Sequence, residues 1–240
     1  MPVAYVLLSK LYQALHYGLR RYRERLFDYR GRYWGAQTLE DIAGYWDTRN
    51  DPHKNAFLLE VIAKYSPSSL LELGANCGNK LYCIAREYPN ARLVGLDISQ
   101  VAVDYGTQRL KEAGIQNVHL QTGRAEELGE FADGSFDVVF SWATLIYPRP
   151  SQIEGIIAEM LRIARRAVVL LEMQTRRRVG LRQARGMYRK GNWKRDYVQL
   201  ISHASSAYGT PEVTWIPTEI WQPGGGGGAV VEASRRPASQ

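Results

Sequence analysis

Small residues form a sharp turn between an apolar run and an expected helix in residues 70–79 (LLELGANCGN). The run ends at Glu72, and residues 74–78 supply the small side chains that a tight turn and a closely bound ligand require. A helix beginning near Gly78 would offer free N–H groups and the positive end of its dipole to an anionic group. The segment predicts a ligand-binding turn.

An acidic residue ends the next apolar run, 25 residues after Glu72. This residue, Asp97, can accept hydrogen bonds from both hydroxyls of a ribose, and Ile98 beside it is placed to cover an adenine. Carboxyl ends of parallel strands meet at one edge of a sheet, so later runs should deliver further residues to the same crevice. These residues are Arg124, Ala125, Ser141 and Trp142. Together the pattern predicts a site for an adenosine-containing cofactor.

Alternating short apolar runs and helical segments would position these residues. The runs lie at 69–73, 91–97, 117–121, 135–141 and 166–172, and they predict an α/β fold with a doubly wound, mostly parallel sheet. Two later runs, 212–218 and 229–233, predict a C-terminal antiparallel hairpin. Ser99 and Asp196 are expected helix N-caps, and Ser151 with Glu154 matches a capping box.

With these motifs in place, the chain resembles the class I S-adenosylmethionine-dependent methyltransferases. ELGANCGN is similar to the first motif of that family, LVGLDIS to its second-strand acidic motif, and DGSFDVVFSWATLIY to its fourth-strand motif. The resemblance covers about residues 53–172 and implies a seven-stranded sheet and S-adenosylmethionine as cofactor. It departs from the family at Asn76, which replaces a glycine but tolerates a left-handed backbone, and at Arg124, where an acid is common.

The resemblance implies roles for most of the residues named so far. Glu72, Gly74, Ala75, Asn76, Cys77 and Gly78 would cradle the methionine part of the cofactor. Asp97 would hold the ribose, and Ile98, Arg124 and Ala125 would surround the adenine, with Ser141 and Trp142 at the same rim. An NAD-linked oxidoreductase is a weaker interpretation, because G-x-G-x-x-G is absent and Asn79 stands at its last position.

Methyl transfer requires mainly alignment and desolvation of the acceptor, and a base only where the acceptor must lose a proton. Three residues are candidates for that base. His53 precedes the first helix of the body, Tyr147 follows the fourth strand, and Glu172 ends the fifth strand. Each also has a plain structural interpretation, as a helix-capping residue, a packed ring or an ion-pair partner.

Two segments outside the cofactor body are candidates for binding the acceptor. Tyr45 and Trp46 lie before the first body helix, where they could close over the cofactor or simply pack in the core. Residues 174–210 form a basic insertion before the hairpin, which we expect to be helical and to cap the substrate. Tyr188 and Trp193 are its candidate contacts with the acceptor, and Tyr147, after the fourth strand, is a further candidate. A solvated basic helix is the alternative for this insertion.

Charge is distributed unevenly along the 240 residues. The net charge is +7, with +5 in residues 1–35 and +11 in residues 162–195, which favours an anionic partner. Residues 1–26 predict an amphipathic basic helix that packs on protein or lies peripherally on the inner membrane face. The two cysteines form no disulfide framework, no cluster of metal ligands is visible, and no signal peptide is evident, so a cytoplasmic location is expected.

The sequence therefore predicts an N-terminal segment, 1–52, that covers the cofactor, followed by a methyltransferase domain, 53–240, with a disordered tail from residue 234. The preferred function is methylation of an oxygen or nitrogen atom on a small-molecule, glycan-type or lipid-linked anionic acceptor. RNA methylation is the alternative, although no base-flipping motif is present. A non-catalytic scaffold is the third hypothesis, and the oligomeric state is left open.

Overall fold

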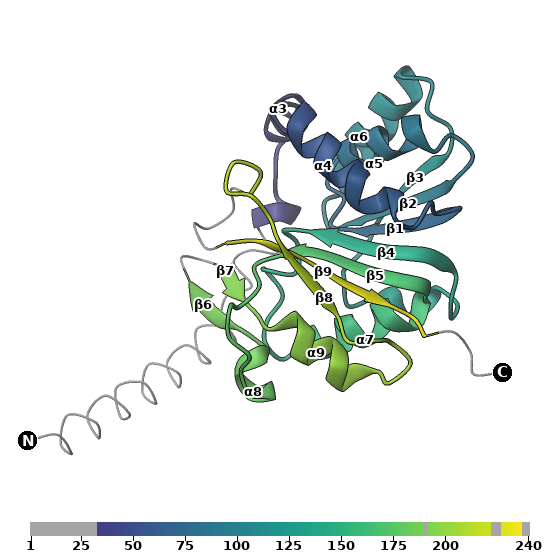
Figure 1. Cartoon of the computed structure of the whole chain (residues 1–240). Coiled ribbons are helices and arrows are strands. Elements are labelled where there is room, and N and C mark those ends of the chain that lie inside the picture. The colour runs from purple at the N-terminus through teal and green to yellow at the C-terminus, as the bar shows by residue number, and fades with distance from the viewer. Residues whose placement is uncertain (1–32, 190–191, 222–226, 237–240) are drawn as a thin grey trace, which may run out of the picture.

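A seven-stranded sheet forms the centre of the computed structural model (Figure 1). The structure describes residues 33–189, 192–221 and 227–236, and for residues 188 and 189 it describes the backbone alone. The strand order is β3-β2-β1-β4-β5-β9-β8, with β9 antiparallel to both of its neighbours and the other pairs parallel. The strands are β1 Ser69–Leu73, β2 Arg92–Asp97, β3 Val118–Thr122, β4 Phe136–Trp142, β5 Ala164–Glu172, β8 Glu212–Trp215 and β9 Ala229–Ser234. The predicted sheet and C-terminal hairpin are confirmed.

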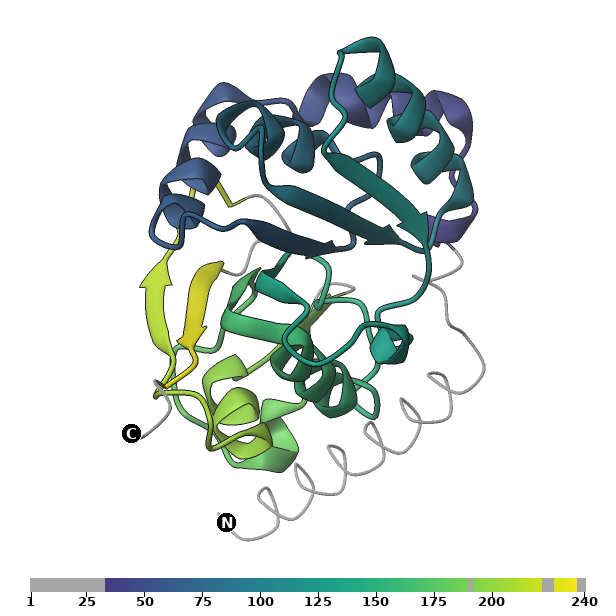
Figure 2. The ribbon, with the colours of Figure 1, turned by 90° about the vertical axis from the view of Figure 1, so that its right-hand side faces the viewer.

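Helices cover both faces of the sheet. Figure 2 shows α3 to α6, in purple to teal, on one side of the strands and the green helices on the other. On the first side are α3 Leu39–Arg49, α4 Pro52–Ala63, α5 Asn79–Glu87 and α6 Gln100–Glu112. On the second are η1 Leu128–Glu130, α7 Ile153–Ile163, α8 Leu181–Ala184 and α9 Tyr197–Ala204. The arrangement is doubly wound, as the sequence predicts.

Alternate residues of each strand supply the two layers of the core. Leu70 and Val138 pack under α4 to α6, whereas their neighbours Leu71 and Val139 pack under α7 and α9. All four side chains are fully buried. A strand buried on both faces must be apolar at every position, and this explains the continuous apolar runs of the sequence.

Side-chain caps start several helices. Ser99 accepts a hydrogen bond from the N–H of Ala102 at the start of α6, and Asp196 accepts one from Gln199 at the start of α9. The capping box expected at Ser151 is wrong, because α7 begins at Ile153 and its N-cap is Gln152. The side chain of Gln152 instead accepts a hydrogen bond from the N–H of Arg149 in the preceding turn, at 2.7 Å.

The insertion of residues 174–210 is only partly helical. It forms α8, a hairpin of β6 Met187–Arg189 with β7 Asn192–Lys194, and α9. α9 packs against α7 and the end of the sheet, because Tyr197, Val198 and Ile201 join the core of that face. The segment is thus largely an extension of the second helical layer.

The two chain ends meet the sequence predictions in part. Ser234 is the last residue of β9, and the N–H of Arg235 donates to the carbonyl oxygen of Arg166. The first residues of the tail that was expected to be disordered from residue 234 therefore belong to the sheet. The helix expected in residues 1–26 and residues 237–240 lie outside the described part of the chain. Among the described residues, every helix is too short or too polar to cross a bilayer.

Two helical glycines allow a matched test of this packing. A Cβ added at Gly106 of α6 would lie 2.2 Å from the carbonyl oxygen of Cys77, whereas one added at Gly155 of α7 would meet nothing within 4 Å. We expect Gly106→Ala to lower the free energy of unfolding by about 1–3 kcal/mol through overpacking. Gly155→Ala should raise it by about 0.5–1 kcal/mol through helix propensity. Urea unfolding followed by circular dichroism measures both, and equal stability of the two variants would contradict the packing described.

Candidate active site

A cavity of about 380 Å³ lies where β1, β2 and β4 end. It is the place that the sequence predicts for a ligand, since carboxyl ends of parallel strands meet there. Seven of the predicted cofactor residues line it: Gly74, Asn76, Asp97, Ile98, Arg124, Ala125 and Trp142. Two of the predicted acceptor residues, Tyr45 and Tyr147, line it as well.

Asp97 ties the turn after β1 to the start of α6. Its Oδ2 accepts a hydrogen bond from the N–H of Asn76 at 2.7 Å, and its Oδ1 accepts one from Ser99 at 2.9 Å. Burial raises the pKa of this carboxyl, while the N–H groups of Ser99 and Asn76 oppose the shift. A carboxylate has further acceptor positions beyond these two bonds, so Asp97 can still bind hydroxyl groups in the cavity.

Asn76 has a left-handed backbone with φ of 50°, as expected for a residue that replaces a glycine of the family motif. Its Oδ1 accepts a hydrogen bond from the N–H of Cys77 at 2.9 Å, which stabilises the turn locally. Its Nδ2 donates to Oε1 of Gln37 at 3.3 Å, so the turn also contacts the segment before α3.

Five of the predicted cofactor residues shape the cavity from behind and do not line it: Glu72, Ala75, Cys77, Gly78 and Ser141. Gly78 has φ of 75° and caps α5, a conformation that favours glycine. Burial raises the pKa of the Cys77 thiol to about 12, so this thiol stays protonated and unreactive at neutral pH.

Glu172 is the anchor of the loop after β4. Its Oε1 accepts hydrogen bonds from Ser141 Oγ at 2.9 Å and from the N–H groups of Thr144 and Leu145 at 3.0 Å each. The side chain is fully buried under this loop. The prediction of Glu172 as a catalytic base is therefore not supported, because the loop separates its carboxyl from the cavity.

His53 also lies away from the cavity. It is exposed in the first turn of α4, and its N–H donates to Oδ1 of the N-cap residue Asp51. The structural interpretation of His53, as a helix-start residue, is the one that fits. Of the three candidate bases, Tyr147 alone lines the cavity.

Aromatic rings form part of the cavity wall. The ring of Trp34 lies 5.6 Å from that of Tyr147 and 6.3 Å from that of Tyr45, centroid to centroid. Figure 1 shows residues 33–38, in purple, at the same edge of the sheet as the β6–β7 hairpin. The N-terminal part of the described chain and the loop after β4 thus build this wall together.

Two other predicted acceptor contacts are packed elsewhere. Trp46 is buried against the rings of Tyr82 and Tyr105, and Trp193 is buried beside the guanidinium of Arg195. For Trp46 the core interpretation is therefore the one that fits. The side chain of Tyr188 lies outside the described part of the chain.

Sequence reasoning missed several residues that line the cavity: Trp34, Lys54, Asn79, Lys80 and Asn192. Lys80 carried a usable signal, because the second residue of a helix beginning at the ligand turn must lie close to that ligand. Trp34 carried none, since its segment reaches the cavity only through tertiary folding. Cationic side chains from α3, α4, α5 and the loop after β3 outnumber the carboxylates of Asp97 and Glu126 in this lining.

Comparison with known proteins agrees with this geometry. Residues 70–167 match the family model described as a methyltransferase domain. An 80-residue stretch is 36% identical to ribosomal RNA small subunit methyltransferase G of Deinococcus radiodurans, covering 32% of each protein. The chain spans about a third or less of the length of the curated relatives that it matches.

Solved structures with the same fold cover much more of the chain. Magnesium protoporphyrin IX methyltransferase from Synechocystis PCC 6803, with S-adenosylmethionine bound, has a TM-score of 0.57 over 91% of each chain at 16% identity. The [4+2]-cyclase SpnF has a TM-score of 0.58 over 74% of this chain and 79% of its own, at 18% identity. One fold thus carries more than one chemistry, and the activity must be argued from the site.

The buried carboxyl of Glu172 gives a pH-dependent prediction. Burial raises its pKa to about 7 from an ordinary value of 4.5. A raised pKa means that its contribution to stability is full below about pH 4.5 and is lost as the pH rises through about 7. Glu172→Gln keeps an acceptor for the three donors and cannot ionise. Between pH 5 and pH 8 we expect its free energy of unfolding to fall about 2 kcal/mol less than that of the wild type.

Urea unfolding at the two pH values measures this difference. Glu172→Ala is the control, since it removes the loop anchor and should be destabilised at both pH values by the unpaired N–H groups. Parallel pH profiles for the wild type and Glu172→Gln would contradict the assignment.

Proposed function

We propose that the chain is a class I S-adenosylmethionine-dependent methyltransferase and that it methylates an oxygen or nitrogen atom of a small anionic acceptor. The observation that carries the proposal is the carboxylate of Asp97, held by two N–H groups at the wall of the cavity. A rigid acceptor group at the end of the second strand is what a ribose requires. A glycan-type or lipid-linked molecule belongs to the same class of acceptor.

The residues around Asp97 suit the remaining parts of S-adenosylmethionine. Ile98 and Ala125 offer an apolar surface for the adenine, and the free N–H groups at the start of α5 face the amino-acid end. In this interpretation Gly74 and Asn76 shape the floor by their left-handed backbone. The cofactor supplies a methyl group on a positively charged sulfur.

The reaction needs alignment more than acid–base catalysis. A lone pair on the acceptor forms the bond to the methyl carbon while the carbon–sulfur bond breaks and its electron pair stays on sulfur, and the acceptor's proton passes to water. The aromatic wall of Trp34, Tyr45 and Tyr147 would exclude water from the reacting atoms and orient the acceptor. We assign Tyr147 to orientation of the acceptor.

Charge supports an anionic acceptor. Arg49 and Lys54 reach the cavity from the covering helices α3 and α4, on the side of Tyr45. A site lined by such cations attracts anions and disfavours a cationic acceptor. The aromatic rings beside them offer flat surfaces on which a sugar or other ring can stack.

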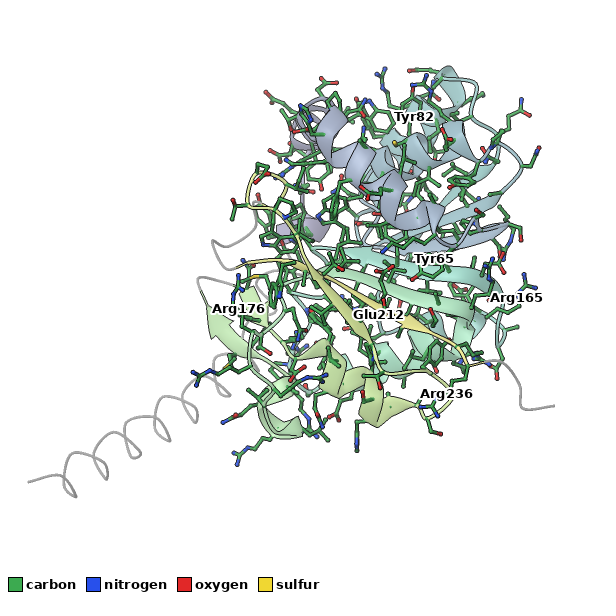
Figure 3. The ribbon with its side chains drawn as sticks, viewed as in Figure 1. Tyr65, Tyr82, Arg165, Arg176, Glu212 and Arg236 are labelled. Carbon is green, nitrogen blue, oxygen red and sulfur yellow. The ribbon has the colours of Figure 1, made fainter. Side chains whose placement is uncertain are left out.

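RNA as acceptor is the second candidate, favoured by the local similarity to a ribosomal RNA methyltransferase. The distribution of positive charge argues against it. Within the basic stretch 162–195, Arg162, Arg165 and Arg185 each pair with a carboxylate, and Arg195 is fully buried. Figure 3 places Arg176 on the opposite side of the molecule from Arg165. A continuous basic surface, which RNA binding favours, is therefore not formed by these residues.

Cofactor binding gives the first prediction. Asp97→Ala should weaken binding of S-adenosylhomocysteine by about 1–3 kcal/mol, or roughly 5- to 150-fold, because ribose hydroxyls and two backbone N–H groups lose their acceptor. Isothermal calorimetry measures the dissociation constants. Asp104→Ala, on the helix α6 that follows Asp97 but outside the cavity, is the control and should bind as the wild type does. Unchanged affinity in Asp97→Ala would refute the ribose assignment.

Activity is tested directly with isotope-labelled methyl groups. Purified protein, labelled S-adenosylmethionine and cell extract are incubated, and products that gain one methyl group are found by mass spectrometry. We expect label in the low-molecular-mass or lipid fraction. Label in RNA that disappears after ribonuclease treatment would establish the alternative, and failure to bind the cofactor at high micromolar concentration would favour a non-catalytic scaffold.

A further inference from the structure

A buried amide group lies in the cavity lining, on the insertion that follows the fifth parallel strand. Asn192, the first residue of β7, lines the cavity and is only 7% exposed. Its side chain forms no hydrogen bond with any other described residue. An amide both donates and accepts hydrogen bonds, and leaving a buried polar group without a partner costs free energy. A ligand that brings a donor and an acceptor into the cavity would complete this group.

Backbone hydrogen bonds hold Asn192 in a fixed place. The N–H of Trp193 donates to the carbonyl oxygen of Ile146 at 2.9 Å, which joins β7 to the loop after β4. The N–H of Arg195 donates to the carbonyl oxygen of Met173 at 3.0 Å, which joins the end of the hairpin to the segment after β5. The amide is therefore carried by a strand that is bonded to the cavity wall, and such support is what a recognition group requires.

The surroundings of Asn192 limit the kind of ligand that fits. In the same cavity the aromatic wall supplies flat apolar faces, and Arg49 and Lys54 supply positive charge. A carboxylate only accepts hydrogen bonds and an ammonium only donates them, whereas a hydroxyl does both, as the amide of Asn192 does. A ring that carries hydroxyls and an acid group therefore uses all three features of the lining.

We propose that Asn192 determines the specificity for the acceptor by pairing with hydroxyl groups of an acidic sugar. The sugar ring packs against the aromatic wall, and its carboxylate lies near the cations of the cavity. Neighbouring hydroxyls on a sugar ring offer one donor and one acceptor to the two ends of the amide. The inference rests on the proposed function and narrows its acceptor to a sugar acid.

The alternative for Asn192 is a purely structural role at the β6–β7 hairpin, where asparagine is common. The two roles differ in how a variant treats ligands that differ only in their hydroxyls. A structural role predicts that all acceptor-like ligands weaken equally when the amide is removed. Recognition predicts a loss for the hydroxyl-bearing ligands alone.

Three small ring compounds separate recognition of hydroxyls from that of charge. Glucuronate carries hydroxyls and a carboxylate, cyclohexanecarboxylate carries the carboxylate on a bare six-membered ring, and glucose carries hydroxyls without the acid. Each is titrated into the full-length protein saturated with S-adenosylhomocysteine, so that the cofactor occupies its own part of the cavity. Chemical shifts in NMR spectra give the dissociation constants.

We expect the wild type to bind glucuronate at least about tenfold more tightly than either of the other compounds. In Asn192→Ala the preference for glucuronate over cyclohexanecarboxylate should fall below about threefold, while cyclohexanecarboxylate itself binds as it does to the wild type. Equal weakening of both acids, or an unchanged preference, would overturn the assignment. A wild type that binds glucose as tightly as glucuronate would overturn the role of the acid group.

Asn55→Ala is the matched control, because Asn55 of α4 also lines the cavity but its Nδ2 donates to Oδ1 of Asn50 at 2.7 Å. Its preference for glucuronate should equal that of the wild type, and a selective loss there would transfer the contact from Asn192 to Asn55. Asn192→Leu keeps the volume of the side chain without its polar atoms and should lose the preference as Asn192→Ala does. Should neither variant fold, the wild type decides: a ratio near one overturns the proposal, and a preference of about tenfold or more supports it.

The failure of the proposed function is distinguishable from that of this inference. A wild type that does not bind S-adenosylhomocysteine refutes the proposed function. A wild type that binds it but shows no preference for glucuronate over cyclohexanecarboxylate retains the proposed function and refutes the role of Asn192.

Discussion

The two last residues of β2 hold the ligand turn in place, and the rest of the cofactor half depends on them. The carbonyl oxygen of Leu96 accepts hydrogen bonds from Gly74 and Ala75, at 2.8 and 3.1 Å, and the carboxylate of Asp97 accepts one from Asn76. These bonds join the turn to β2 without any contribution from a ligand. Asp97 also accepts a hydrogen bond from the N–H of Ser99, the N-cap residue of α6. One carboxylate thus connects the turn after β1 to the start of α6, and these two segments support the same side of the cavity.

The acceptor half depends on a different pair of buried charges. Glu172 holds the loop after β4 by three donors, and the guanidinium of Arg195 donates to the carbonyl oxygens of Leu145, Pro148 and Arg185. Each group is costly to bury, and its hydrogen bonds to backbone atoms fix the course of the chain around it. The wall that carries Tyr147 is therefore shaped by residues of the insertion as well as by the common fold. This explains why similarity in sequence ends near residue 167 while the cavity extends beyond it.

Local sequence rules placed more of the residues at the ends of β1 and β2 in the cavity lining than residues of its aromatic wall. A small-residue turn and an acid at a strand end each act within a few residues, so Asn76 and Asp97 could be placed from the sequence alone. Glu172 ends a strand at the edge where the cavity lies, but the loop after β4 covers its carboxyl, and strand topology alone does not report this. The Ser151 capping box failed because the side chain of Gln152 satisfies the turn before α7. Trp34 reaches the cavity by tertiary contacts that no local pattern reports.

The runs of basic residues in the sequence do not coincide with the place where cationic side chains converge in the structure. In the run 162–195, Arg162, Arg165 and Arg185 form ion pairs, and Arg195 donates to buried backbone. Figure 3 places Arg165 and Arg176 on opposite sides of the molecule. The cavity, by contrast, gathers Arg49, Lys54, Lys80 and Arg124 from four different elements. Charges that converge on a partly buried site interact more strongly than charges exposed along a surface, because water and salt screen them less. The cations that line the cavity therefore contribute more to its electrostatic potential than exposed basic residues elsewhere on the surface do.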